Sequence, residues 1–395
     1  MKRAISILCL LTVLLTAGCG ADATVPGTDD GYQTLRDSYF CVSGASCGRQ
    51  AWKLNIADGS ILVACPDPIC GHGPDDVSCP FRGVIPVSVA DGGRYMFYIG
   101  WGPDGNVIYC FDTEENATSV IYKYDKLGSN WLFLFGEGRL YFDVPQMKTA
   151  NGEIIETTAR TVMYYDTGTG KTGVFGTKDE RDWVQFVQDG KLYYRNESSA
   201  GLFATDGSFD GSEPVELPEG GKYGPWGDYY TCGPGYIVKS YPPGDIYLFA
   251  EGRSVPMPPE TSESIMVGTT ATSGTFYFTL GSFTAGYNLS EETEDGHYTG
   301  KVCILDSDGS YRLYSVQSNF SFYVVKGFGN RIVCEVLSEY SNGADLIPGT
   351  NEENTKCSHL LIDLDSGKVS AYNVYAESAD GLHLYDAEFK VGRVK

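Results

Sequence analysis

GRLYFDV, residues 138–144, begins with a glycine and continues as a short run rich in aromatic and aliphatic residues. Runs of this kind, bounded by turn residues, are typical of β-strands. The same element recurs about 40 to 56 residues apart, and such recurrence indicates a repeat architecture. Its other copies are GRYMFYIG (93–100), GKLYYRN (190–196), GYIVKS (235–240), GTFYFTL (274–280) and GNRIVCEV (329–336), with SYFCV (38–42) as a degenerate first copy.

A second element, a hairpin with an acidic or glycine-containing turn, follows each copy of the first. The Asp-Gly and Ser-Gly steps of these hairpins supply the positive φ angles that tight turns require. A third element precedes the first, where Trp131, Trp183 and Trp226 recur at a similar spacing. The hairpins are WKLNIADGSILV (52–63), VIYKYDKLGS (120–129), VMYYDTGTGKTGVF (162–175), GLFATDGS (201–208), IYLFAEGRSV (246–255), VCILDSDGSYRLY (302–314) and LLIDLDSGKVSAY (360–372).

These elements together give four strands per unit and a period near 45 residues. They predict an all-β fold, a β-propeller of seven four-stranded blades, with six or eight blades as alternatives. A large sandwich or two packed β-domains is the competing architecture. We expect GLHLYD (381–386) and the final VGRVK to close the ring against the N-terminal strands, because closure removes exposed sheet edges.

The N-terminus has the pattern of an export signal. Lys2 and Arg3 precede an apolar run, residues 4–15, that is shorter than a membrane-spanning helix. The sequence LTAGC (15–19) resembles the lipobox of bacterial lipoproteins, which implies that Cys19 carries lipid. An ordinary signal peptide is the alternative. We therefore predict a signal peptide (1–18), a lipidated cysteine with a flexible tether (19–30) and one propeller domain (31–395), anchored at the extracellular face of the cell membrane.

The net charge of the chain is −22, and the predicted signal peptide removes two of its positive charges. So acidic a surface disfavours binding to nucleic acid or to anionic lipid. The hydrophobic content of 42% is sufficient for a large core. We expect a monomeric domain outside the cell.

The strands of each unit are expected to run from the axis outward, so that alternate connections share one face. The connections between second and third strands are predicted to be long loops at residues 101–118, 145–160, 281–300 and 338–357. Long loops in compact domains carry function or are disordered, and both alternatives stay open here.

One segment has clear chemical character, CPDPICGHGPDDVSC at residues 65–79. Cys65, Cys70, His72 and Cys79 could hold a structural Zn²⁺ ion. Disulfides within this segment or to Cys41 and Cys47 are the interpretation we favour, because disulfides staple small loop-rich regions of exported proteins. No other cofactor is expected. Cys110 is predicted to lie on the same rim.

Two further cysteines, Cys303 and Cys334, stand in apolar strand-like runs and are expected to be buried as small hydrophobic residues. DSDGS (306–310) lacks the remaining ligands of a calcium loop, so a hairpin turn is expected there.

The lipobox, the glycine-led strands and the Cys-x4-Cys-x-His…Cys segment together resemble propeller-like lipoproteins of Gram-positive, mostly clostridial, gut bacteria. The resemblance covers most of the mature chain and implies a fold and a location but no activity. The Cys41–Cys47 pair departs from the usual pattern of that group.

Known catalytic motifs are missing from the sequence: it contains no Gly-x-Ser-x-Gly, phosphate-binding glycine loop or His-Glu-x-x-His. We therefore predict a non-enzymatic module that binds a protein, peptide or glycan through its loop-rich face. The alternative is a carbohydrate-active hydrolase or lyase with a carboxylate site at the axis.

Overall fold

The computed structural model contains strands and turns, with no α-helix among the residues it describes. None of these segments forms a helix long and apolar enough to cross a membrane. The described residues are 34–35, 39–43, 51–56, 61–63, 84–90, 94–102, 105–112, 114–115, 117–124, 132–196, 201–210, 212, 214–218, 221–223, 229–240, 243–249, 251–259, 264–272, 274–282, 291–292, 298–318, 321–337, 359–372 and 390–393.

The described strands form antiparallel sheets, and each sheet is built from strands that follow one another in the chain, except that the C-terminal strand β29 (Lys390–Arg393) joins the sixth sheet. The first sheet consists of β1 (Thr34–Leu35), β2 (Tyr39–Ser43), β3 (Ala51–Asn55) and β4 (Ile61–Val63). The second consists of β5 (Val84–Ala90), β6 (Tyr95–Gly102), β7 (Gly105–Asp112) and β8 (Ala117–Tyr124). The third consists of β9 (Phe133–Gly136), β10 (Arg139–Ala150), β11 (Glu153–Asp166) and β12 (Lys171–Asp179).

The fourth and fifth sheets are β13 (Asp182–Gln188), β14 (Lys191–Asn196) and β15 (Leu202–Thr205); and β16 (Tyr229–Gly233), β17 (Tyr236–Ser240), β18 (Pro243–Leu248) and β19 (Arg253–Val255). The sixth is β20 (Ser264–Thr272), β21 (Thr275–Ser282), β23 (Tyr298–Asp306) and β24 (Tyr311–Ser318), with β22 (Glu291–Glu292) beside β23. The seventh is β25 (Ser321–Phe328), β26 (Arg331–Leu337), β27 (His359–Asp363) and β28 (Val369–Tyr372).

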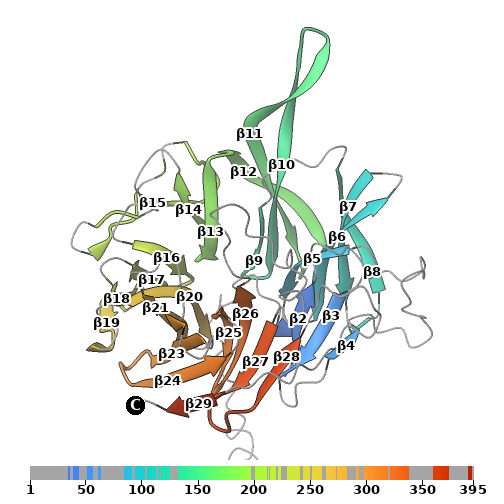
Figure 1. Cartoon of the computed structure of the whole chain (residues 1–395). Helices are drawn as coiled ribbons and strands as arrows, with labels where there is room; N and C mark the ends of the chain where they lie inside the picture. The colour runs from blue at the N-terminus through green and yellow to red at the C-terminus, as the bar shows by residue number, and fades with distance from the viewer. Residues whose placement is uncertain are drawn as a thin grey trace, which may run out of the picture.

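The sheets follow one another around a ring, so that the last one lies beside the first (Figure 1). The first strands of successive sheets contact one another, as β5 does β9, β9 does β13, and β20 does β25. In these sheets the first strand is therefore innermost, and the fold is all-β and propeller-like. The predicted glycine-led strands are confirmed, since they are the second strands β2, β6, β10, β14, β17, β21 and β26.

The core is divided among the junctions between neighbouring sheets. At one junction Phe97 and Ile108 of the second sheet pack against Leu140 and Phe142 of the third. Equivalent buried clusters join the third sheet to the fourth and the sixth to the seventh. Because no sheet has a core of its own, each face is buried only when its neighbour is in place.

Tight turns occur at several of the residue–Gly pairs of the sequence. Glu137-Gly138, Asn151-Gly152 and Asp189-Gly190 have positive φ at both residues, from 52° to 83°, which is the geometry of a two-residue hairpin. The turn at Asp306–Ser310 is likewise a hairpin turn, as predicted, closed by hydrogen bonds between the backbones of these two residues and between Gly309 and Asp306.

A charged pair recurs at the turn end of three sheets. An arginine at the start of the second strand pairs with an aspartate that ends the third, in Arg94–Asp112, Arg139–Asp166 and Arg331–Asp363, at 3.1 to 3.3 Å. Oδ1 of each aspartate also accepts a hydrogen bond from a backbone N–H of the turn that follows. The pair joins the turn to the neighbouring strand.

Several expectations about connections were wrong. Residues 101–118 are not a long loop: β6 pairs with β7 as far as Gly102–Gly105, and the hairpin expected at 120–129 is instead formed by β7 and β8. Residues 145–160 are also strand, because β10 and β11 run on as one long hairpin. In the other two connections, β22 and the start of β23 lie within 281–300, and residues 338–357 lie outside the described residues.

The expected closure by the C-terminus was wrong as well. The strand β29 (Lys390–Arg393), which overlaps the final VGRVK, pairs with β24, so it extends the outer edge of the sixth sheet. β29 thereby covers the outer edge of β24, which would otherwise be exposed. Its own backbone groups are paired with β24, so it needs no N-terminal partner. GLHLYD (381–386) lies outside the described residues.

Candidate functional site

Most of the predicted site residues lie outside the described residues: Cys19, Cys47, Cys65, Cys70, His72 and Cys79. Cys41 is placed in β2. In the part of the chain that the structure describes, no three His, Cys, Asp or Glu side chains are grouped to hold a metal ion. The zinc and disulfide interpretations of residues 65–79 therefore both stay predictions.

The cysteines with described side chains, Cys110, Cys232, Cys303 and Cys334, form no disulfide with one another. Cys303 and Cys334 are fully buried in strands, as predicted. The rim position expected for Cys110 was wrong: it lies in β7 and packs in the core between the second and third sheets, because its strand replaces the expected loop. Cys232 contacts the Tyr223 hydroxyl at 3.0 Å.

The most distinctive surface feature is the hairpin of β10 and β11, which projects far beyond the ring (Figure 1). We call its outer part, residues 146–158, the arm. β9 pairs with β10 only as far as Phe142, and β12 pairs with β11 only as far as Ala159. Beyond these points the arm is a two-stranded ribbon that no other described strand accompanies.

The arm leaves the sheet at an irregularity in the strand pairing. The register shifts between Pro145 and Met147, so that Gln146 of β10 stands opposite three residues of β11, 157–159. The Thr157 hydroxyl donates to the Gln146 carbonyl at 3.0 Å, and the Gln146 side chain donates to Thr161 at 3.1 Å. Such bulges bend strands and re-aim them, which explains how the ribbon departs from the ring.

Large apolar side chains are exposed on the arm. Ile154 is 72% exposed, Met147 43% and Ile155 38%. In the strand register Met147 lies opposite Glu156, and Ile154 lies opposite Thr149, so Met147 and Ile154 are neighbours on one face. Ile155 stands on the other face, opposite Lys148. An exposed apolar group on a projecting element is typical of an interaction surface.

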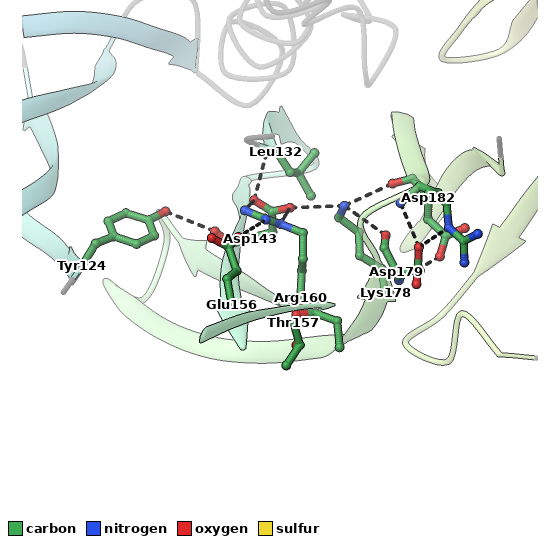
Figure 2. A network of polar contacts seen from close by, with 11 residues as sticks. Tyr124, Leu132, Asp143, Glu156, Thr157, Arg160, Lys178, Asp179 and Asp182 are labelled. Carbon is green, nitrogen blue, oxygen red and sulfur yellow. Dashed lines mark hydrogen bonds and ion pairs between the residues drawn. The ribbon is translucent and has the colours of Figure 1, made fainter. Parts of the chain in front are cut away.

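A buried ionic network holds the base of the arm (Figure 2). The Arg160 guanidinium donates from Nε to Oδ2 of Asp143 at 2.7 Å and from Nη1 to Oε1 of Glu156 at 3.0 Å. Lys178 Nζ lies 3.2 Å from the same Asp143 carboxylate. The Arg160 and Asp143 side chains are each 1% exposed and that of Lys178 is 5% exposed.

The network continues into the next sheet. Lys178 Nζ donates to the Asp182 carbonyl at 3.1 Å, and the Asp182 carboxylate accepts from the Asp179 backbone N–H and the Asn196 side chain. Figure 2 shows Lys178 between Asp143 and Asp182. The base network thus runs from β10 across β11 and β12 to β13, which fixes the arm to two sheets.

The Asp143 carboxylate is fully engaged. Oδ1 accepts from the Leu132 backbone N–H at 3.0 Å, and Oδ2 accepts from Arg160 and lies against Lys178. Both positive groups compensate its charge, as a buried carboxylate requires. A carboxylate that is buried and saturated in this way cannot reach a substrate, so the base network is structural.

One aromatic side chain is exposed next to this network. Trp183, on the innermost strand of the fourth sheet, is 38% exposed, and the Arg195 guanidinium lies 5.8 Å from its ring centroid. Arg195 is opposite Trp183 in the register of β13 and β14. Cation–π contact on one side of the ring leaves the remainder available to solvent.

The arm was missed in the sequence analysis, although a signal for it was present. Asn151-Gly152 is a strong two-residue hairpin signal, and it stands between TA and EIIETT. The buried ionic network has no comparable local signal, because its residues meet only through the pairing of β10, β11 and β12.

No family model matches this chain, and no curated protein matches it. Among solved structures, it is similar to an acylaminoacyl peptidase of Pyrococcus horikoshii, at 11% identity and a TM-score of 0.47, over 84% of this chain and 50% of that one. A structure from a study of two prolyl endopeptidases is similar at 12% identity and a TM-score of 0.46, over 93% of this chain and 50% of that one.

The chain thus spans about half the length of these peptidases. It is also similar to the β-propeller domain of the trilobed protease from Pyrococcus furiosus, at 10% identity and a TM-score of 0.39, over 76% of this chain and 93% of that one. At such identities and scores, no activity is carried over to this chain.

Proposed function

We propose that this protein is a lipid-anchored extracellular interaction module, a seven-bladed propeller that binds a protein or peptide through its arm. The observation that carries the proposal is the arm itself, a projecting ribbon with Ile154 72% exposed above a buried ionic base. A rigid base limits the conformational entropy that a partner must overcome when it binds.

The arm favours a polypeptide partner over a glycan. Its exposed large side chains are aliphatic, Met147, Ile154 and Ile155, whereas sugars are commonly bound against aromatic rings. Trp183 is the observation that favours a glycan as a second candidate ligand. Replacing Trp183 with Ala distinguishes the two candidate ligands. It should abolish binding of a glycan that stacks on the Trp183 ring, and it should leave binding of a polypeptide to the arm unchanged.

The alternative of a carbohydrate-active hydrolase or lyase gains no specific support from the described carboxylates near the arm. Asp143 is buried, and Asp182 accepts hydrogen bonds from Asp179 and Asn196. A glycosidase pair must face a cleft with a free acid and a free base. Release of reducing sugar from cell-wall or plant polysaccharides by the purified protein would revive this alternative.

Photo-crosslinking in the cell envelope of the producing organism tests the binding function. A photoreactive residue at position 154 should form a covalent adduct with one defined polypeptide. The matched control is position 174, since Val174 is 63% exposed on β12, outside the arm. Equal adducts at both positions, or none at 154, would refute the arm as the binding element.

The membrane anchor is a separate part of the proposal and rests on the LTAGC sequence at residues 15–19. Cells that make the protein in the presence of a labelled fatty acid should incorporate label into it. The Cys19→Ser variant should carry no label and should leave the membrane fraction. Label retained in Cys19→Ser would overturn the anchor.

For the cysteine segment we propose two disulfides, within residues 65–79 or from there to Cys41 and Cys47, with a zinc site of Cys65, Cys70, His72 and Cys79 as the alternative. Native mass spectrometry combined with alkylation under denaturing, non-reducing conditions distinguishes them. Disulfides leave Cys65, Cys70 and Cys79 protected and the mass without metal, whereas zinc adds mass natively and leaves these thiols free.

A further inference from the structure

The two long edges of the arm differ in how well they resist pairing with another strand. An unaccompanied ribbon presents backbone N–H and C=O groups along both edges, and proteins blunt such edges with Lys, Pro and bulges. The β10 edge carries Pro145 and Lys148. The β11 edge, EIIETT at residues 153–158, contains neither Lys nor Pro, and its irregularity is confined to its inner end, where residues 157–159 stand opposite Gln146. Along Glu153–Glu156 the β11 edge therefore lacks the protection that Pro145 and Lys148 give to β10.

The hairpin geometry indicates which backbone groups of the β11 edge are available. With a two-residue turn at Asn151-Gly152, the flanking pair Ala150–Glu153 is the hydrogen-bonded kind, and pairs then alternate along the ribbon. The backbone groups of Ile154 therefore point away from the ribbon on the β11 side, and those of its partner Thr149 point away on the β10 side.

The start of this free edge is set by the ring. β12 pairs with β11 up to Ala159, and the Thr158 carbonyl accepts from the Glu180 N–H at 2.7 Å. Beyond Thr158 no described residue is paired with the outer side of β11. A strand added to Glu153–Thr157 would continue the line of β12, which makes the arm an extension of the third sheet.

Most of the charged side chains around this edge are acidic. Glu153 and Glu156 belong to the edge itself, Glu153 exposed and Glu156 accepting a hydrogen bond from Arg160. Asp179 and Glu180 lie where β12 ends. Two cations are also near: Lys148, which lies opposite Ile155 in the strand register, and Arg181, which pairs with Asp179 at 2.7 Å. With a net charge of −22, the whole chain repels another acidic strand, including a second copy of itself. A basic partner is complementary.

We propose that the β11 edge of the arm, Glu153–Thr157, binds an extended polypeptide segment by strand addition, and that this segment alternates apolar and basic residues. Backbone hydrogen bonds supply the affinity, Ile154 and Ile155 contact apolar side chains on the two faces, and the acidic surroundings select for lysine or arginine. The proposal rests on the arm as the binding element and adds the mode of binding and the chemistry of the partner.

A matched pair of proline variants tests the edge. Proline removes one backbone N–H, and at an outward-facing position it leaves the pairing within the ribbon intact. Ile154→Pro removes the outward N–H on the β11 edge, and Thr149→Pro removes its counterpart on the β10 edge. The probe is a synthetic peptide with blocked ends that alternates valine and lysine, compared with one that alternates valine and glutamate.

Binding of the fluorescent peptides to the purified protein is measured by anisotropy. We expect the valine–lysine peptide to bind at least about tenfold more tightly than the valine–glutamate peptide. Ile154→Pro should weaken this binding by about tenfold or more, whereas Thr149→Pro should change it less than about twofold. Because Ile154→Pro also removes an apolar side chain, Ile154→Ala is included and should retain measurable binding.

Three outcomes overturn the proposal: equal binding of the two peptides, equal loss in the two proline variants, or no binding to the unaltered protein. Thermal unfolding within a few degrees of the parent shows that each variant is folded. These results are distinguishable from failure of the proposed function, because a specific crosslink at position 154 without peptide binding would support the arm and reject strand addition.

Discussion

Arg331 donates from Nη1 to the carbonyl oxygen of Ile56 at 2.8 Å, across 275 positions of the chain. Arg331 begins the second strand of the seventh sheet, and Ile56 follows the third strand of the first. This contact joins the last sheet to the first. No described strand is shared between these two sheets, so side-chain contacts of this kind hold the ring closed.

Replacing Arg331 with Ala should therefore weaken the junction. A charged hydrogen bond of this kind contributes on the order of 1 to 2 kcal/mol to the free energy of unfolding. Amide hydrogen exchange should speed up in β2, β3 and β26 before it does elsewhere. Arg94→Ala is the control, because its pair with Asp112 lies within one sheet. Equal effects of the two variants on β2 and β3 would contradict the role given to Arg331.

Breaking the ionic network at the base of the arm should lower the free energy of unfolding by more than the Arg331 variant does. Arg160→Ala leaves the buried Asp143 carboxylate with Lys178 as its remaining cation, and loss of one member of a buried ion pair costs about 3 to 5 kcal/mol. Chemical denaturation measures this loss, and exchange in β10 and β11 should report a loosened arm. The exposed pair Arg181–Asp179 is the control, since Arg181→Ala should change stability little. A similar loss in both variants would show that the network does not hold the arm.

The recurring Arg–Asp pairs predict a pH dependence. Hydrogen bonds from the Thr169 hydroxyl and N–H lower the pKa of Asp166, and the Ser366 N–H lowers that of Asp363. Because the folded pKa lies below the unfolded value, the stabilisation is present above about pH 4 and is lost as the pH falls through the folded pKa. In Asp166→Asn this loss between pH 4 and 2 should be shallower, as measured by urea unfolding at each pH. An unchanged slope would exclude Asp166 as a contributor.

The repeated strands were predicted from the sequence, whereas the arm was missed although its Asn151-Gly152 turn was visible there. A glycine followed by aromatic and β-branched residues specifies a strand locally, so GRLYFDV became β10 and GNRIVCEV became β26. The length of β10 was misjudged because PQMKTANGEIIETT contains polar residues on both faces. A ribbon exposed on both faces has no apolar alternation, which is the signal that distinguishes a strand from a loop.

The ionic network escaped prediction for a different reason. Asp143 and Arg160 are 17 positions apart, and they meet diagonally across the strands, because Arg160 pairs with Pro145 and Asp143 pairs with Val162. Lys178 lies opposite Arg160 in the pairing of β11 with β12, beyond a register shift between Val162 and Met163. Bulges insert one residue into one strand, and no local residue pattern in this chain marks their positions.

The junction between the third and fourth sheets has no room for an added methyl group. A Cβ at Gly176 would lie 1.9 Å from the Gly207 carbonyl oxygen, and the backbone cannot yield there as a side chain could. Gly176→Ala should therefore lower the free energy of unfolding by roughly 1 to 3 kcal/mol. Val174→Ala, two residues away and exposed, should stay within about 0.5 kcal/mol of the parent. A neutral Gly176→Ala would mean that the two sheets separate easily.

The thiols of the core should resist modification in the folded protein. Burial raises the pKa of Cys110 to about 12, and burial raises that of Cys232 to about 12 as well. The thiolate is the reactive form, so at pH 8 both thiols are almost wholly protonated, and they are also shielded from reagent. Peptide mapping after native alkylation should show Cys110, Cys232, Cys303 and Cys334 unlabelled, and labelling in denaturant should reach all of them. Native labelling of Cys110 at the rate of a small exposed thiol would place it on the surface and would contradict its packing between the second and third sheets.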